Sequence, residues 1–426
     1  MQFLEVSINT RFQICYTLFM STKEKVLEFL QQNLKNPVSG EKLAEICGVS
    51  RTAIWKAMNS LRDEGYQIEG STNGGYILQE MADIFSKEDF LRFLKDDWIN
   101  TEKNRTENPT PQDFSDFPDF PVVECFKTID STNSYAKRIL SECGNLRNPD
   151  GTLTEAGKKY HKSIFLAESQ TAGRGRLGRT FVSPEKTGIY LSLIYAPEGG
   201  ITEPAKLTAF SAVALVRVIK KLYKIDAKIK WVNDIFIAGK KICGILTEGS
   251  ANFETGLIEA AVVGIGVNIS DNPEVFAANK AAGSIIGAGI FPPVAGNCPP
   301  GNGICSPGTR HPLENSPTEE ENPLSTGLSA QNPAKITRCQ LAAEIVNEVL
   351  QIFQENPAKV MAEYKSYSFL IGKTVEVHPI IGDDKSAYQA KVIDIDDNAG
   401  LVVQLADNSL KTLSSGEVSL HSDQTF

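Results

Sequence analysis

The chain has 426 residues, enough for two or three domains. Its hydrophobic fraction of 41% and charged fraction of 22% are ordinary for a soluble protein, and its net charge of -9 excludes a polycation that binds nucleic acid over its whole surface. The eight cysteines form no Cys-x-x-Cys pair, which argues against a disulfide framework or a zinc site and favours reduced thiols in a cytoplasm.

The first twenty residues are moderately apolar, but Glu5 and Arg11 interrupt them. They are too short and too polar for a transmembrane segment. We expect residues 1–20 to be a disordered extension, or a mis-called start whose true initiator is Met20. No other segment could span a membrane, so the sequence predicts a cytoplasmic protein without a membrane partner.

Residues 21–80 predict a winged helix-turn-helix domain. Ser21, Ser39 and Ser50 each stand where the N-cap of a helix is expected, and Gly48 would end the second helix. Two β-prone runs follow, and the Asn73-Gly74 pair between them is a strong hairpin signal. Three helices followed by a hairpin are typical of a winged DNA-binding domain.

The third helix of this domain leaves polar side chains outward near its start. Such side chains read base edges and phosphates in the major groove, and we expect operator DNA as a partner. The predicted DNA-binding residues, including the tip of the wing, are Arg51, Thr52, Lys56, Asn59, Asn73 and Gly74. The alternative is a small three-helix bundle used for protein contact, whose charges are only solvated. The short turn, the polar outer face and the wing favour DNA.

The segment 81–121 is polar and rich in proline, and we expect a short helix near residues 87–95 followed by a linker. A domain with catalytic features covers residues 122–370, and its strands and helices predict one mostly antiparallel or mixed sheet. We expect a hairpin in it that turns at residues 238–240, and a later helix that Thr337 caps. Within it, residues 144–162 are typical of an insertion or a long loop. Residues 280–334 are dominated by proline, glycine, serine and asparagine, which predicts a disordered surface insertion.

The C-terminal residues 371–426 predict a small β-barrel of SH3-like size. Its four predicted strands are residues 375–377, 388–395, 401–405 and 410–413. The whole chain is therefore expected to be a multidomain α+β protein. It would carry an N-terminal winged helix-turn-helix, a central α/β sheet domain and the C-terminal barrel.

The loop from Gly173 to Arg179 alternates glycine with three arginines. The guanidinium groups repel each other unless the loop closes over an anion, and glycine lets the backbone approach and move. We therefore predict a mobile lid that orders on a nucleotide or an acyl phosphate. The same letters match the dinucleotide fingerprint, but residues 180–184 are β-prone and end in proline, so no helix N-terminus would face a pyrophosphate. A kinase loop fails because no His-Arg-Asp or Asp-Phe-Gly set follows.

Four segments of the central domain carry polar groups that a fold alone would not need. They are the lid with Gln170 ahead of it, residues 230–234, residues 241–248 and residues 264–268. Each lies at a strand end or a hairpin turn, where sites tend to collect. Lysine and arginine would neutralise phosphates, and asparagine or aspartate could hold a magnesium ion. Any one segment could be a strand edge or a bulge, but the four together predict a site.

Three of these segments read Gly-Arg-Gly-Arg-x-Gly, Lys-Trp-x-Asn-Asp and Lys-x-x-Gly-Ile-Leu-x-Glu. In this order they resemble the biotin–protein ligase family, and the full chain resembles its bifunctional members, the biotin operon repressors. The resemblance covers residues 21–78 and 122–420 apart from the insertions. It implies a class II synthetase-like central domain. It also implies that the carboxylate of biotin attacks the α-phosphate of ATP to give biotinyl-5′-AMP, from which a lysine of a biotin carboxyl carrier protein displaces AMP.

The resemblance also implies roles for individual residues, with ATP and Mg²⁺ needed beside biotin and no permanently bound cofactor. Biotin-binding residues would be Ser131, Thr132, Asn133, Gln170, Gly173, Arg174, Gly175, Arg176, Lys241, Gly244 and Leu246. Nucleotide-binding residues would be Arg176, Arg179, Lys230, Asn233, Asp234 and Asn268. Lys241 and Arg176 would be catalytic, and Asn233 and Asp234 would hold Mg²⁺ with ATP.

Three positions depart from the family pattern. Val232 stands where proline is usual, Phe181 where tryptophan is common, and Leu177 where some members have a basic or polar lid residue. We expect altered packing and altered lid closure, with activity retained.

The resemblance further implies a biotin-responsive repressor, in which the adenylate orders the lid, the central sheets pair edge to edge, and a homodimer binds a two-fold operator. Two alternatives remain: a ligase whose winged helix no longer binds an operator, and an adenylate-sensing regulator without transfer activity. A lipoate-type ligase is a remote alternative, because it would not be expected to carry the glycine-arginine loop.

Overall fold

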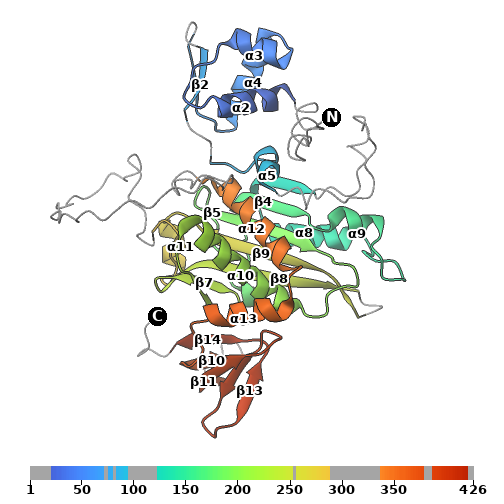
Figure 1. Ribbon diagram of the computed structural model, residues 1–426, viewed down its shortest axis with the longest axis vertical. Coiled ribbons are helices and arrows are strands. Elements are labelled where there is room, and N and C mark those ends of the chain that lie inside the picture. Colours follow the sequence, from blue (N-terminus) through green and yellow to red (C-terminus); the bar gives the residue numbers. More distant parts are fainter. Residues whose placement is uncertain are drawn as a thin grey trace, which may run out of the picture.

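The computed structural model describes residues 21–71, 75–79, 83–94, 122–252, 256–287, 336–378 and 386–420 (Figure 1). The predicted N-terminal extension, the predicted wing tip Asn73-Gly74 and residues 288–334 of the predicted insertion lie outside these residues. Figure 1 shows the N-terminal head at the top, the central sheet domain in the middle and a small β domain at the bottom.

The head is a winged helix-turn-helix, as predicted. Its elements are α2 (Thr22–Gln32), α3 (Gly40–Cys47), α4 (Arg51–Asp63), β1 (Ile68–Ser71) and β2 (Gly75–Leu78). Ser21 and Glu24 form a reciprocal capping box at the start of α2, and Ser39 and Ser50 cap the next two helices. The apolar sides of the three helices meet in a core of their own that also includes Leu78 from the wing.

The helix predicted near residues 87–95 is α5 (Lys87–Phe93), and it lies between the head and the central domain (Figure 1). Two adjacent residues ahead of it face opposite ways. Ile84 packs against the core of the head, whereas Phe85 belongs to the core of the central domain. This short segment therefore joins the two cores rather than running free over the surface.

The central domain is built on one seven-stranded sheet with strand order β3-β4-β5-β9-β8-β7-β6. Its strands are β3 (Val123–Ile129), β4 (Ile164–Gln170), β5 (Gly188–Tyr195), β6 (Lys228–Lys230), β7 (Asp234–Ile237), β8 (Lys240–Ala251) and β9 (Ile258–Asn268). Only β3 and β4 run parallel, and all other neighbours are antiparallel. This confirms the predicted mixed sheet and the predicted hairpin turn at residues 238–240.

Helices cover both faces of the sheet. Its helices are α8 (Thr132–Glu142), α9 (Glu155–Tyr160), α10 (Pro204–Tyr223), α11 (Pro273–Ala278), α12 (Arg338–Ile352) and α13 (Pro357–Tyr367). Val263 and Ile265 of β9 share the core with α10 and α12, whereas Val262 packs with Ala136 and Leu140 of α8. Because strand residues alternate between faces, α8 lies on the opposite face from α10.

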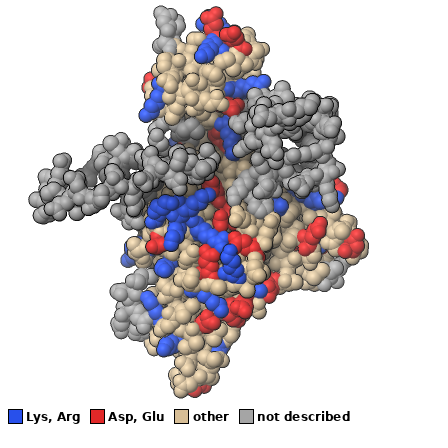
Figure 2. Space-filling model, viewed as in Figure 1, with Lys and Arg blue, Asp and Glu red and all other residues tan. Residues whose placement is uncertain are grey.

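Basic and acidic side chains lie side by side on the face that Figure 2 shows. In the central domain, Arg217 of α10 pairs with Glu348 of α12, with Glu363 of α13 and with Glu355 in the turn between them. The surface charge is therefore mixed there. None of the helices in the described part of the chain reaches the length and apolar character that a bilayer span requires.

Two loop predictions in the central domain were wrong in part. Residues 144–162 contain α9, which Thr154 caps and whose Gly157 is buried. Residues 280–287 pack against the sheet, because Ala282 bridges Lys241 of β8 and Ile285 is fully buried. Glycine and alanine dominate residues 281–288, so composition alone gave no sign of this long-range pairing.

The C-terminal domain is a five-stranded antiparallel sheet with strand order β13-β12-β11-β10-β14. Its strands are β10 (Thr374–His378), β11 (Tyr388–Ile395), β12 (Leu401–Gln404), β13 (Leu410–Leu413) and β14 (Glu417–Leu420). Four were predicted, and β14 was not. The described pairings do not close the sheet into a ring, but the arrangement is compatible with the expected SH3-like fold. Trp231 donates from Nε1 to the carbonyl of Ala399 at 2.7 Å, which ties this domain to the central one.

Candidate functional site

The predicted lid, residues 173–179, lies in the loop that connects β4 to β5. The residues around it, 171–183, fold back on themselves and are called the lid below. A Cβ added to Gly173 would lie 2.3 Å from the carbonyl oxygen of Phe181, so only glycine fits at this approach. At the tip, Leu177 has a φ of 60°, a left-handed conformation that is uncommon for leucine. Its side chain is 57% exposed. The lid is thus an ordered loop with a strained and exposed tip.

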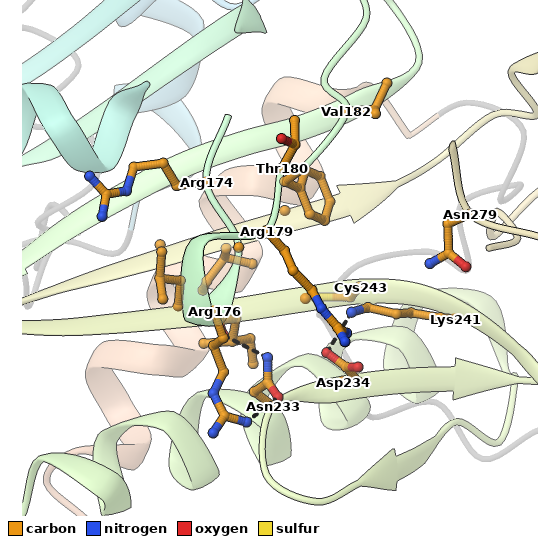
Figure 3. Close-up of a pocket in the computed structure, with 18 of the residues that line it drawn as sticks. Arg174, Arg176, Arg179, Thr180, Val182, Asn233, Asp234, Lys241, Cys243 and Asn279 are labelled. Carbon is orange, nitrogen blue, oxygen red and sulfur yellow. Dashed lines mark hydrogen bonds and ion pairs between the residues drawn. The ribbon is translucent and has the colours of Figure 1, made fainter. Parts of the chain in front are cut away.

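Beneath the lid lies a cavity of about 210 Å³, lined by α8, β7, β8, β9, α11 and the start of β14 (Figure 3). All four segments singled out in the sequence reach it. The predicted residues that line it are Ser131, Thr132, Asn133, Gln170, Arg174, Gly175, Arg176, Arg179, Lys230, Asn233, Asp234, Lys241, Gly244, Leu246 and Asn268. Gly173 does not line the cavity and acts through the backbone of the lid.

Neutral polar groups occupy the α8 side of the cavity. Ser131 caps α8, which places Thr132 and Asn133 at the buried start of the helix. Thr132 donates to Oε1 of Gln170 from its backbone nitrogen at 2.9 Å and from its hydroxyl at 3.2 Å. Gln170 in turn donates from Nε2 to the hydroxyl of Ser183 at 2.8 Å. This side can bind an uncharged polar ligand through amide and hydroxyl groups.

Two glycines of β9 make room for larger side chains on the same side. A Cβ at Gly264 would lie 2.1 Å from Oδ1 of Asn133, and one at Gly266 would lie 2.5 Å from the ring of Phe181. Phe181, the departure noted in the sequence, packs edge-on against Tyr190 with ring centroids 6.3 Å apart. Phe181 forms part of the cavity wall, so its phenyl ring occupies the place where tryptophan is common in the family.

Cations occupy the β7–β8 side of the cavity. Nζ of Lys241 lies 2.7 Å from Oδ1 of Asp234, and Nη1 of Arg176 donates to Oδ1 of Asn233 at 3.0 Å. Figure 3 shows Lys241 directed toward Asp234 and Arg176 toward Asn233, while Arg174 points away from both. Burial lowers the pKa of Lys230 and the pKa of Arg176. Cations gathered in a partly desolvated pocket favour an anionic ligand.

The side chains of Asp234 and Asn268 already make contacts within the protein, which the sequence did not indicate. Oδ1 of Asp234 is buried and meets Lys241 as an ion pair without accepting a well-formed hydrogen bond. Asn268 is buried and donates from Nδ2 to the carbonyl of Gly283 at 3.0 Å, which holds residues 280–287 against β9. The Asp234 carboxylate therefore remains able to accept from a ligand, while Asn268 has a structural contact as well.

The C-terminal domain also reaches the cavity, which the sequence did not indicate. Arg179 donates from Nη1 to Oε1 of Glu417 at 2.8 Å, and Arg176 donates from Nη2 to the carbonyl of Gly416 at 3.4 Å. The two acceptor residues, Gly416 and Glu417, lie where β14 begins, and no local sequence motif marks them. The lid thus rests on two domains at once.

In the head, the predicted DNA-binding residues of α4 share one outer face. Arg51, Thr52 and Lys56 are exposed, and Trp55 between them is 55% exposed. Asn59 is half-buried and accepts a hydrogen bond from Arg62 at 3.4 Å. Asn73 and Gly74 lie outside the described residues. The α4 face thus presents cationic, polar and aromatic groups together, as a helix that enters the major groove would.

Three protein-family models match the chain. They are the biotin/lipoate A/B protein ligase family over residues 152–268, a helix-turn-helix domain over residues 22–77, and the biotin protein ligase C-terminal domain over residues 370–421.

Among curated proteins, the bifunctional ligase/repressor BirA of Bacillus subtilis is 26% identical over 408 residues, which cover 93% of this chain and 98% of that protein. The protein of the same name from Escherichia coli is 30% identical over 232 residues, which cover 54% of this chain and 59% of that protein.

Among solved structures, a biotin protein ligase from Aquifex aeolicus in complex with biotin and ATP aligns with a TM-score of 0.47 and 18% identity, over 71% of this chain and 99% of that one. The family matches follow the chain from the head through the central domain to the C-terminal domain. With this order of domains, and with a relative aligned over nearly all of its length, the chain belongs to the biotin protein ligase family.

Proposed function

We propose that this protein is an ATP-dependent biotin–protein ligase that forms biotinyl-5′-AMP and transfers biotin to a lysine of a biotin carboxyl carrier protein. The observation that carries the proposal is the single cavity with two unlike sides. Its α8 side offers neutral amides and hydroxyls from Thr132, Asn133 and Gln170. Its β7–β8 side offers Lys241, Lys230 and two of the lid arginines, Arg176 and Arg179. A neutral ring system and a triphosphate would be bound side by side.

In the first step the carboxylate of biotin attacks the α-phosphorus of ATP, and pyrophosphate leaves. The two reactants are both anionic, so their approach requires nearby positive charge. Lys241 and Arg176 line the cavity at this point and would supply that charge. Lys241 is paired with Asp234, and incoming anionic oxygens would take the place of that carboxylate.

We expect magnesium to reach this site together with ATP. Among the described residues, no group of three His, Cys, Asp or Glu side chains is arranged to hold a metal. Mg²⁺ that bridges phosphates needs only one or two protein ligands, and the Asp234 carboxylate, with Asn233 beside it, would provide them. When bound, the ion would neutralise part of the phosphate charge.

In the second step the lysine amine of the carrier attacks the acyl carbon of biotinyl-AMP, the bond from that carbon to the phosphate oxygen breaks, and AMP leaves. Water would compete with the amine, so the adenylate has to be covered until the carrier arrives. Arg174, Arg176 and Arg179 hold the lid over the cavity by contacts to β8, to Asn233 just before β7, and to β14. We place the reaction in the cytoplasm, which agrees with the free thiols among the described cysteines.

We further propose that the head represses transcription when the adenylate is bound. Arg51, Thr52 and Lys56 would contact operator DNA from the outer face of α4. A two-fold operator calls for a homodimer. The central sheet ends in β3 and β6, and because Ser368 bridges Ile229 on the outer side of β6, the edge of β3 is the candidate for pairing between subunits. Analytical ultracentrifugation with and without biotin and ATP tests this step, and an unchanged mass at micromolar protein would contradict it.

The ligase is tested by mass spectrometry of a biotin carrier domain after incubation with this protein, ATP, Mg²⁺ and biotin. We expect a mass gain of one biotin on the carrier lysine, and its loss in Lys241→Ala and Arg176→Ala variants. Lys240→Ala is the matched control, because the neighbouring Lys240 is exposed, donates to the carbonyl of Lys280 and does not line the cavity.

Two other outcomes would revise the proposal. If biotinyl-AMP stays on the protein and the carrier gains no mass, the protein is an adenylate-sensing regulator without transfer activity. If neither product forms, the ligase proposal fails altogether.

A further inference from the structure

Glu248 ends the third motif, and none of the roles above uses it. It lies on β8 two residues beyond Leu246 and four beyond Gly244, both of which line the cavity. Side chains alternate along a strand, so all three face α8 and the lid. Thr247 faces the other way, where its hydroxyl accepts a hydrogen bond from Thr208 of α10 at 2.8 Å.

The carboxylate of Glu248 meets three donors from two other elements. Oε2 accepts from Nδ2 of Asn133 at 3.0 Å, and Oε1 accepts from Nζ of Lys137 at 2.9 Å and from Nη2 of Arg174 at 3.4 Å. The side chain is 16% exposed. Burial acts to raise the pKa of Glu248, but the hydrogen bonds from Lys137 and Asn133 and the nearby positive charges outweigh it and lower the pKa. The group is therefore ionised at neutral pH.

An ionised carboxylate can only accept hydrogen bonds, and this fixes the amide of Asn133. Nδ2 of Asn133 donates to Glu248 and to the carbonyl of Leu246 at 3.2 Å. Both amide hydrogens are then used, so Oδ1 takes the other position, where it accepts from the hydroxyl of Ser192 at 2.5 Å. A neutral group in place of Glu248 would leave the amide free to turn.

The hydrogen bonds continue from Asn133 beneath the lid to its far end. The Ser192 hydroxyl lies 2.8 Å from that of Thr132, and the backbone nitrogen of Thr132 donates to Gln170 at 2.9 Å. Gln170 donates to Ser183, whose hydroxyl donates to the carbonyl of Phe181 at 3.0 Å. Arg174, near the start of the lid, contacts Glu248 directly. One carboxylate thus connects to both ends of the lid, once directly and once through a chain of buried polar groups.

We propose that Glu248 is a positioning residue of the ligase, which orients the Asn133 amide for biotin and anchors both ends of the lid. The inference rests on the proposed function. Loss of the carboxylate should weaken biotin binding and admit water to the adenylate, where it adds to the acyl carbon and releases AMP. The cations on the β7–β8 side do not contact Glu248 and should bind ATP as before.

The test compares Glu248→Gln with the wild-type protein and with Glu155→Gln. Glu155 is a matched control, because it pairs with Lys158 at the same 2.9 Å and lies on α9 outside the cavity. The KM values for biotin and ATP and the AMP released per biotin transferred are measured for all three. We expect Glu248→Gln to raise the biotin KM about tenfold, the size of one lost charge-assisted hydrogen bond. The AMP ratio should rise, and the ATP KM should change less than about twofold.

A wild-type biotin KM and a wild-type AMP ratio in Glu248→Gln would overturn the proposal. So would an equal rise in both KM values, since that would mean a general loosening of the domain. If Glu248→Gln does not fold, Glu248→Asp serves instead: it keeps the charge but withdraws it from Asn133, and we expect the same direction of change.

The wild-type protein separates this proposal from the proposed function. If it transfers no biotin, the ligase proposal fails. Calorimetric titration of biotin still compares the wild type with Glu248→Gln, and equal affinities would overturn the role of Glu248.

Discussion

Arg179 of the lid and Arg338 at the start of α12 both pair with carboxylates, but in opposite surroundings. The side chain of Arg179 is 59% exposed, and its partner Glu417 is 31% exposed. Arg338 is 2% exposed and donates to Asp83, to Glu168 and to the carbonyl of Gly188. It also lies over the ring of Phe85, 4.8 Å from the centroid.

The two environments imply different roles for the same kind of pair. Exposed ion pairs contribute little to stability, so phosphate oxygens can replace Glu417 on Arg179 at small cost. A buried arginine that loses a partner leaves a charge without solvation, so the pairs of Arg338 are permanent. Arg179 of the lid can exchange its carboxylate partner for phosphate oxygens, whereas the segment from residue 83 to residue 94 is fixed to the central domain.

The largest expected effect is from Arg338→Met. The change leaves the Glu168 carboxylate buried with only the backbone nitrogen of Phe85 as a donor, and we expect a loss of about 3–5 kcal/mol in the free energy of unfolding. Urea denaturation followed by circular dichroism measures it. Arg179→Met is the matched control, with an expected loss below about 1 kcal/mol. Equal losses of unfolding free energy in the two variants would contradict the difference between the buried and the exposed ion pairs.

The next largest effect is on the pH dependence of stability and comes from His161, a buried group without an ion pair among the described residues. Burial lowers the pKa of His161 to about 4, and its Nδ1 accepts a hydrogen bond from the backbone nitrogen of Ala196 at 3.1 Å. The unfolded chain binds the proton more readily, so stability is complete above about pH 6.5 and falls as the pH drops toward 4.

Lowering the pH from 7 to 5 should therefore reduce the free energy of unfolding by about 2 kcal/mol. Urea midpoints at both pH values, for the wild type and His161→Asn, measure the difference. The same pH dependence in both proteins would mean that another group is responsible.

A smaller effect is expected at the contact between α5 and the head. Asp89 accepts from the hydroxyl of Tyr66 and from Nε2 of Gln31, both at 3.3 Å. Asp89→Ala should lower the free energy of unfolding by about 1 kcal/mol. It should also speed amide hydrogen exchange in α5 and the wing. Ligase activity should not change, because Asp89 is remote from the cavity lining. Asp63→Ala, on the exposed end of α4, is the control. Unchanged exchange in Asp89→Ala would show that apolar packing alone holds the head.

The smallest effect is expected from Glu417→Gln. Removing this exposed partner of Arg179 should change the free energy of unfolding by less than about 1 kcal/mol, and less still at high salt. The measurement is the urea midpoint at low and at high sodium chloride. A loss comparable with that of Arg338→Met would place the lid pair among the permanent ones.

Local signals in the sequence were sufficient for most elements. Ser21, Ser50 and Thr337 cap helices where the residue pattern predicts them, because a cap depends on neighbours within one turn. The hairpin at residues 238–240 was likewise confirmed, and it places Lys241 beside Asp234. The roles of the site residues stay predictions.

What the sequence did not predict depends on contacts between distant segments. Glu417 reaches the cavity only because β14 pairs with β10 and the C-terminal domain packs under the lid. Residues 280–287 are held by Lys241 and Asn268, which no local pattern reveals. The network of Arg338 joins residues 83, 168 and 338, and each of them is an ordinary polar residue in its own sequence context.

The neighbouring residues Ile84 and Phe85, which belong to different hydrophobic cores, have a consequence for protein engineering. A chimera that exchanges the DNA-binding head cannot be joined at an arbitrary point of the connecting segment. Residues from Asp83 onward belong with the ligase, since Arg338 and Glu168 bind them, and the incoming head must present an apolar surface to Ile84. Recombination between residues 79 and 83 keeps the core of the incoming head whole, whereas a junction within α5 would separate side chains that fold together.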